Sequence, residues 1–231
     1  MGITDDLILM QRFTLIHDGS GLGWQAAYLA FYVAVRLGAP LRVLLVDPSA
    51  DDETLAQKSA DIEIGGRAAG VEIETQIVAD ISLDTITGYI TDLNGLFIPK
   101  RLVPDGETAA RWLEVVSCPL WIVSRESVTR KMAVLVENPD KDEDLITYTA
   151  RLAQRMNETL TGLIPGEESP SPTIQDSIRL TWVPLQVLSL PSIVSALNRL
   201  HIDLLFIRPS NTFLVSKLDC TCVVYPGFVD A

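Results

Sequence analysis

Short apolar runs alternate with longer helix-like segments along most of the chain. The first run, residues 13–18 (FTLIHD), ends at a Gly-Ser-Gly sequence, which predicts a buried strand followed by a tight loop. Residues 24–37 are rich in alanine and apolar on every side, and Gly38 follows them as a helix stop. A second continuous apolar run, residues 41–47, completes a βαβ unit.

The same alternation continues through the first half of the chain. The strand expected at 71–78 alternates apolar and polar side chains, which indicates a more exposed place in the sheet. Ser82 and Asp105 are suitable helix caps. We expect helices over residues 54–69, 82–93 and 105–116 and strands over 71–78, 95–98 and 118–123. Strands alternating with helices predict a parallel α/β domain with right-handed crossovers.

The pattern then starts again. MAVLVE at 132–137 corresponds to FTLIHD, LLFI at 204–207 corresponds to GLFI, and Cys220 corresponds to Cys118, which indicates an internal repeat. The second copy is shorter where helices are expected, because 166–177 is rich in Pro, Ser and Glu and 208–219 holds two or three turns at most.

We therefore predict two consecutive five-stranded parallel-sheet domains of the three-layer α/β/α Rossmann type. The first, complete domain is expected over residues 1–126 and the second, shortened domain over 127–231. Composition supports a folded chain, because 48% of the 231 residues are hydrophobic and 21% are charged.

Charge and hydropathy exclude several classes of protein. The 30 acidic and 18 basic residues give a net charge of −12, which repels nucleic acid and anionic membranes. No run approaches the roughly 20 apolar residues that a membrane helix needs, and the acidic start is unlike a secretory leader. We expect a cytoplasmic protein whose three cysteines are buried, reduced thiols.

Four landmarks in the first half resemble those of the universal stress proteins. They are Asp18-Gly19-Ser20 after the first strand, Val46-Asp47-Pro48 after the second, Gly70-Val71-Glu72-Ile73 at the third, and Cys118-Pro119 before the last. The resemblance implies a tandem universal stress protein with an adenine-nucleotide-hydrolase-like fold and a degenerate second domain. It also implies an internal pseudo-dimer in which strands Leu120–Val123 and Cys222–Tyr225 pair antiparallel, hiding both edges.

Members of this family that bind ATP carry a spaced glycine motif after the fourth strand, which lets bare backbone approach the phosphates. Here only Gly106 remains, and Asp105 and Glu107 place negative charge beside it. Lys100 and Arg101 favour phosphate binding, since two cations can hold a phosphate without the glycines. The resemblance thus leaves a remnant nucleotide crevice, whose candidate residues are Asp18, Gly19, Ser20, Val46, Lys100, Arg101 and Gly106.

Other chemistry is poorly supported. The run from Gly19 to Gly23 has Trp24 where a dinucleotide fingerprint needs its third glycine. His17 and Asp18 point to opposite faces of a strand and cannot form a catalytic pair. The acidic clusters 51–53 and 140–144 lack calcium-loop spacing, so we expect them to be solvated.

The sequence therefore predicts a non-enzymatic stress-response or regulatory protein without a catalytic residue, a metal or a bound cofactor. The alternative is a sensor that binds ATP or AMP in the first-half crevice and hydrolyses ATP slowly at most. A protein partner is expected but not identified, and pairing of whole chains into a homodimer stays open.

Overall fold

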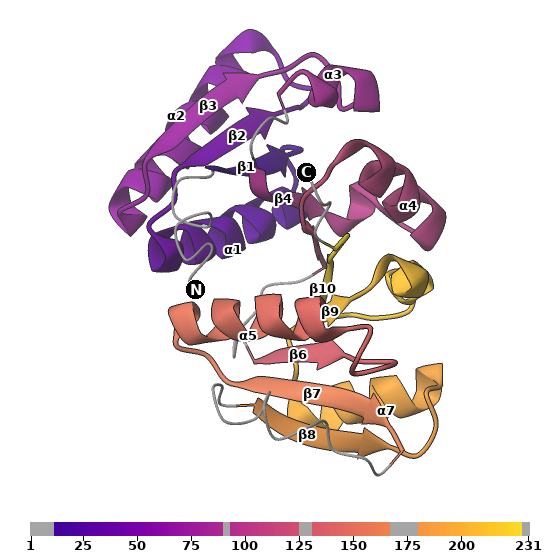
Figure 1. Ribbon diagram of the computed structural model, residues 1–231. Coiled ribbons are helices and arrows are strands. Elements are labelled where there is room, and N and C mark those ends of the chain that lie inside the picture. The colour runs from indigo at the N-terminus through magenta and orange to yellow at the C-terminus, as the bar shows by residue number, and fades with distance from the viewer. Residues whose placement is uncertain (1–11, 90–92, 125–130, 167–179, 228–231) are drawn as a thin grey trace.

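The computed structural model describes residues 12–89, 93–124, 131–166 and 180–227 (Figure 1). The first half contains β1 (Arg12–His17), α1 (Gly21–Leu37), β2 (Leu41–Leu45), α2 (Asp52–Ala69), β3 (Ile73–Ile77), α3 (Leu83–Thr87), β4 (Leu93–Pro99), the short 3-10 helix η1 (Lys100–Leu102), α4 (Gly106–Val115) and β5 (Leu120–Val123). The second half contains β6 (Met132–Leu135), α5 (Glu143–Met156), β7 (Leu160–Pro165), β8 (Leu180–Leu185), α7 (Leu190–Leu200), β9 (Leu204–Ile207), the 3-10 helix η2 (Pro209–Leu214) and β10 (Thr221–Val224).

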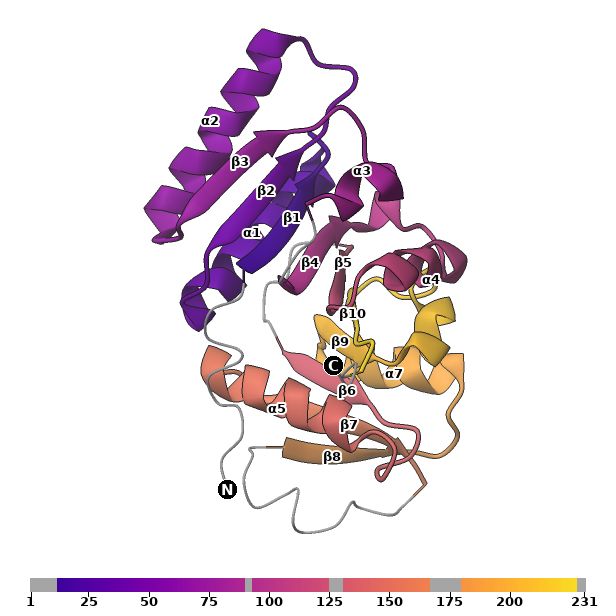
Figure 2. The same ribbon diagram turned by 45° about the horizontal axis from the view of Figure 1, so that its top comes forward.

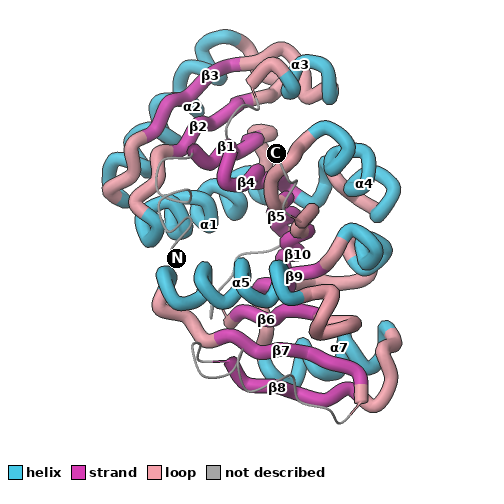
Figure 3. Tube along the Cα trace, in the orientation of Figure 1, coloured by secondary structure: helices cyan, strands magenta, loops and turns pink. Residues whose placement is uncertain are grey.

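The described strands form a single ten-stranded sheet. Its order is β3-β2-β1-β4-β5-β10-β9-β6-β7-β8, and Figure 3 shows the strands as one series through the middle of the molecule. The strands pair in parallel within each half. β5 and β10 pair antiparallel, with Trp121 opposite Val223. The expected internal pseudo-dimer is therefore confirmed, and both closing strands lie in the centre of the sheet.

Helices cover both faces of the sheet. Buried side chains from α1, α2 and α5 form one apolar cluster, and those from α3, α4, α7 and η2 form another on the opposite face. Figure 2 shows α5 and α7 flanking β6 from opposite sides. The predicted three-layer α/β/α class is confirmed, and the continuous apolar strands are explained by burial on both faces.

Side-chain caps fix where several helices begin. The Ser20 hydroxyl accepts the amide of Gly23, and the Asp51 carboxylate accepts that of Thr54. These caps start α1 and α2 a few residues earlier than the apolar pattern predicts. Asp105 caps α4 as expected, by accepting the amide of Thr108. Gly38 ends α1 in the left-handed conformation, at φ 65°.

The third helix of the first half is the main difference from the prediction. A helix was expected over residues 82–93, but α3 covers only Leu83–Thr87 and ends at Gly88, because glycine stabilises a helix poorly. Most of the expected loop at 166–177 and the expected division between the domains lie outside the described residues. The three cysteines are free and buried, as predicted. No helix in the described ranges is long and apolar enough to cross a membrane.

Candidate functional site

Asp18 and Arg101 lie together at the carboxyl edge of the first-half sheet. Asp18 follows β1 and Arg101 lies in η1, directly after β4, and these two strands are parallel neighbours. Arg101 Nε donates to Asp18 Oδ2, and Arg101 Nη2 donates to the Asp18 backbone oxygen at 2.9 Å. The Asp18 side chain is 4% exposed and that of Arg101 is 50% exposed. The arginine thus reaches from solvent onto a buried carboxylate.

Ser20 occupies the second oxygen of Asp18. Its hydroxyl donates to Asp18 Oδ1 at 2.6 Å and its amide donates to the same atom at 3.1 Å. The hydroxyl also accepts the amide of Gly23 at 3.1 Å. One serine therefore caps α1 and fixes the carboxylate, so both oxygens of Asp18 have donors. We call Asp18, Ser20 and Arg101 the Asp18 site.

A second ion pair lies beside this site. Gly19 has φ 72° and lies against Asp47, whose Oδ2 accepts from Lys58 Nζ at 2.5 Å. Hydrogen bonds from Lys58 and Ser49 lower the pKa of Asp47 to about 2. A side chain at position 19 would collide with Asp47 and adopt an unfavourable backbone conformation. The glycine predicted to approach a ligand is required here by the fold.

His17 is the last residue of β1 and is buried against Trp24 of α1. Its Nδ1 accepts the amide of Gly19 at 3.1 Å, and its ring packs edge-on against Trp24 with 4.8 Å between centroids. Burial lowers the pKa of His17 to about 4, so the imidazole is neutral and protonated on Nε2. That nitrogen has no partner within the described part of the chain. Within the described residues neither ring nitrogen bonds to Asp18, although the His17 and Asp18 side chains both lie near Gly23.

The other candidate residues, Val46, Lys100 and Gly106, make contacts within the described chain that do not include the Asp18 or Arg101 side chains. Val46 is buried in the apolar cluster beneath α3 and α4. Lys100 Nζ donates to the backbone oxygen of Leu218, in the second half, at 2.6 Å. A Cβ on Gly106 would lie 2.8 Å from the backbone of Thr212, so the start of α4 packs directly on η2. Lys100 was expected as a cation for phosphate and Gly106 as the remaining glycine of the motif, whereas both form contacts between the halves.

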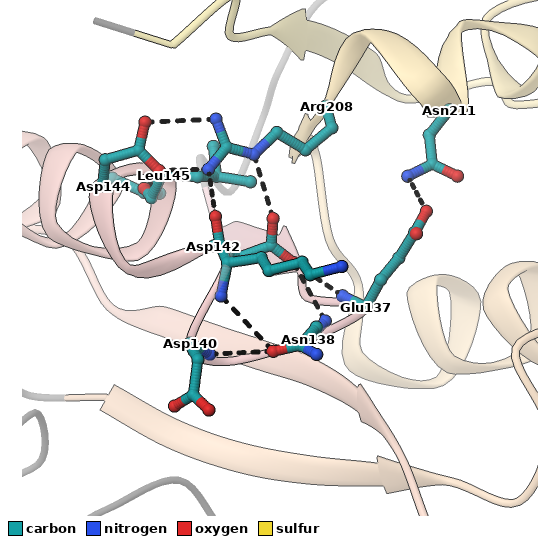
Figure 4. A network of polar contacts seen from close by, with 10 residues as sticks. Glu137, Asn138, Asp140, Asp142, Asp144, Leu145, Arg208 and Asn211 are labelled. Atoms are coloured by element: carbon teal, nitrogen blue, oxygen red, sulfur yellow. Dashed lines mark hydrogen bonds and ion pairs between the residues drawn. The ribbon is translucent and has the colours of Figure 1, made fainter.

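The second half has its own arginine at the carboxyl edge of the sheet (Figure 4). Arg208 follows β9, and its Nε donates to Asp142 Oδ1 at 2.9 Å. Its Nη1 donates to Asp144 Oδ2 at 3.2 Å, its Nη2 donates to Asp144 Oδ1, and Nη2 also donates to the backbone oxygen of Lys141 at 3.0 Å. Burial alone would lower the pKa of Arg208, but the hydrogen bonds to Asp144 and Asp142 raise it. We call this cluster the Arg208 network.

Asp142 connects the network to the loop after β6. Its Oδ2 accepts the amides of Glu137 and Asn138 at 2.9 and 3.1 Å, and the Glu137 carboxylate accepts from Asn211 Nδ2 at 2.6 Å. The Arg208 guanidinium also lies over the ring of Tyr225, 5.7 Å from its centroid. The backbone and side chains of this loop are thus held by polar contacts from η2 and α5.

The expectation that residues 140–144 are solvated was wrong for Asp142, which is only 5% exposed. A buried carboxylate needs a partner, and Arg208 supplies it from 66 positions away in the chain. The sequence feature that could have indicated this ion pair is Arg208, which directly follows the apolar strand LLFI. The two halves are alike in this respect. Arg101 follows β4, the neighbour of β1, and Arg208 follows β9, the neighbour of β6, and each arginine is paired with acidic side chains.

Comparisons with solved structures identify the fold. A universal stress protein from Archaeoglobus fulgidus superposes with a TM-score of 0.72 at 12% identity, covering 98% of this chain and 100% of that one. A putative universal stress protein from Pseudomonas aeruginosa gives 0.63 at 14% identity, covering 95% and 94%. A functionally unknown protein from the same species gives 0.64 at 14% identity, covering 96% and 94%.

These structures cover 95% to 98% of the chain, so both halves together have the fold seen in universal stress protein structures. The fold that the sequence landmarks implied is confirmed. No family profile matches the sequence, and no curated protein matches it.

Proposed function

We propose that this chain is a tandem member of the universal stress protein family and acts as a non-enzymatic stress-response or regulatory protein. In this role it binds a protein partner and does not use a nucleotide. The observation that carries the proposal is the position of Arg101 on the carboxylate of Asp18. The resemblance to the family implies that this carboxylate would face the adenine and ribose of a nucleotide.

The hydrogen bonding of Asp18 supports this proposal. Both carboxylate oxygens already accept from Arg101 or Ser20, so a ribose hydroxyl would have to displace one of these donors. Displacing Arg101 leaves a buried carboxylate without its counter-charge, which is unfavourable. The internal pair therefore competes with a nucleotide at this position.

The surroundings of α4 also support it. A phosphate-binding helix start needs open space in front of its first amides. Gly106 packs instead against the backbone of Thr212 and Phe213 in η2. Asp105, whose pKa is lowered by its hydrogen bonds to Thr108, and Glu107 in the first turn add negative charge there.

The alternative is a sensor that binds ATP or AMP, and one observation favours it. The Arg101 side chain is half exposed, so it can turn from Asp18 toward a phosphate without unfolding its surroundings. Lys100 is less suited to this role, because its ammonium group is bonded to Leu218. In this alternative Asp18 is released to the sugar when Arg101 moves to the phosphate.

Thermal unfolding of the full chain in the presence of nucleotide distinguishes the two functions. We expect no change in melting temperature with millimolar ATP or AMP, and no nucleotide released from freshly purified protein after denaturation. A rise of several degrees, which follows from selective binding to the folded state, would refute the proposal. The alternative further requires that Arg101→Ala abolish the rise. Arg111→Ala, at an exposed pair on α4, is the charge-matched control that must retain it.

A further inference from the structure

The two outer strands of the sheet, β3 and β8, each pair with only one other strand in the described part of the chain. In a β-strand the N–H and C=O of one residue point to the same side, and those of the next residue point to the opposite side. Alternate residues of an outer strand therefore direct their backbone groups away from the sheet, where another chain can pair with them.

Strand β8 carries a proline among these outward residues. The Leu185 oxygen accepts the amide of Gly166, directly after β7, so positions 181, 183 and 185 face β7 and positions 180, 182 and 184 face outward. Position 184 is Pro184, which has no amide to donate. A proline at such a position prevents an added strand from pairing.

Strand β3 has no such proline. The Val78 amide donates to the Leu45 oxygen of β2 at 3.0 Å, so the even-numbered residues of this stretch face β2. The outward residues are Ile73, Thr75 and Ile77, and each has both an amide and a carbonyl. The outer edge of β3 thus presents an uninterrupted row of backbone donors and acceptors.

The side chains beside this edge are partly apolar. Ile73 packs against Gly66 of α2, and Ile77 lies on the same face of the strand and is 49% exposed. Figure 2 shows α2 running alongside β3. A strand added to β3 would therefore pass next to α2, and its alternate apolar side chains would cover Ile77.

The charge of this region indicates the composition of a suitable partner. Residues 51–80, which contain α2 and β3, hold 8 acidic and 2 basic side chains, so they carry −6 of the total net charge of −12. Glu72 is exposed and lies with Glu74 on the face of β3 opposite Ile73. A basic segment is attracted to this surface, and an acidic one is repelled.

A second copy of the chain is a less suitable occupant. Two copies joined at β3 would bring their α2 helices together across the new junction. Neighbouring strands lie about 4.8 Å apart, whereas the axes of packed helices need about 8–10 Å. The junction would also oppose two segments of the same negative charge. A single extended segment brings neither a helix nor like charge.

We propose that an extended, basic segment of a partner protein adds to the outer edge of β3 as a further strand of the sheet. Its alternate apolar side chains lie against Ile77 beside α2, and its basic side chains lie on the face of Glu72. This inference rests on the proposed function, in which the chain binds a protein partner.

A peptide of alternating lysine and valine, Lys-Val-Lys-Val-Lys-Val-Lys, is the probe. Labelled with fluorescein, it should bind the full chain in an anisotropy titration, whereas Glu-Val-Glu-Val-Glu-Val-Glu should not. Thr75→Pro removes an outward amide and leaves the bonds to β2 in place, so it should weaken binding about tenfold or more. Thr75→Val, which keeps the amide, is the matched control and should bind normally. Absence of binding by the basic peptide, or equal binding to Thr75→Pro and Thr75→Val, overturns the proposal.

Hydrogen exchange followed by NMR provides the second measurement. The peptide should protect the amides of Ile73, Thr75 and Ile77, whereas the amides of Glu74 and Gln76, which already face β2, should change little. Uniform protection, or protection confined to other elements, would place the peptide elsewhere and refute the proposal. If the chain is a dimer by light scattering and Thr75→Pro makes it a monomer, the occupant is a second copy and the proposal is wrong. A rise in melting temperature with ATP would refute the proposed function without altering peptide binding, so the two fail separately.

Discussion

Arg101 binds both the side chain and the backbone oxygen of Asp18, and it does so from a helix that follows the neighbouring parallel strand. The carboxyl edge of a parallel sheet is where α/β proteins hold ligands. In this chain the edge is occupied in both halves by arginines paired with acidic side chains of the same chain. Each arginine thus supplies a counter-charge to a buried carboxylate at this edge.

Replacing Asp18 with Asn should destabilise the first half by about 1–2 kcal/mol, less than the loss for a fully buried pair, because Arg101 is half solvated. The midpoint of urea unfolding measures this loss. Glu107→Gln, which breaks the exposed pair with Arg111, is the control and should change stability by less than about 0.5 kcal/mol. Equal effects of the two substitutions would show that the Asp18 site contributes no more than a surface ion pair.

Replacing Arg208 with Met should cost more, about 3 kcal/mol, because it leaves the buried Asp142 carboxylate without a counter-charge. Arg208→Lys should recover only part of the loss, since one ammonium group cannot reproduce the separate bonds to Asp142, Asp144 and Lys141. Denaturant unfolding of the three proteins measures the order of stability. A lysine variant as stable as the original would mean that charge alone, without the guanidinium geometry, holds this loop.

Gly106→Ala should weaken the packing of α4 on η2. The added Cβ would come within 2.8 Å of the Thr212 backbone, which cannot move as a flexible side chain does, so we expect a loss of about 1–3 kcal/mol. Gly21→Ala is the matched control, because it also lies at the first position of a helix and meets no atom within 4 Å. The control should be neutral or slightly stabilising. If Gly106→Ala leaves stability unchanged, η2 lies farther from α4 in solution than in the structure.

Local signals in the sequence predicted most of the fold. The apolar runs identified the strands, and the predicted caps Ser82 and Asp105 accept the amides of Thr85 and Thr108. The short α3 was missed because the expected helix was continued past Gly88, the residue at which α3 ends.

The candidate site was only partly predictable, because its contacts join positions far apart in the chain. Asp18 was identified by its place after the first strand, and Arg101 as a cation that could hold a phosphate. Their mutual ion pair was not, since it joins positions 83 residues apart. Lys100 and Gly106 contact Leu218 and Thr212, so their surroundings depend on how the second half packs against the first. No pattern within residues 99–108 contains that information.

Acid should destabilise the protein through His17. The folded-state pKa of His17 is lowered from 6.5 to about 4 by burial, so between these values the unfolded chain binds a proton that the folded chain does not. Stability therefore rises with pH from 4 to 6.5 and is fully retained above 6.5. A difference of this size in the pKa corresponds to about 3 kcal/mol of stability at pH 4 and below.

The variant that tests this prediction is His17→Asn, whose side-chain oxygen can still accept a hydrogen bond from the Gly19 amide. Urea unfolding across pH 4 to 7 should show a flatter profile for this variant than for the original chain, whereas parallel profiles would mean that other groups cause the acid sensitivity. Asp47 does not confuse the comparison, because its pKa of about 2 confines its loss of stabilisation to pH values below about 4.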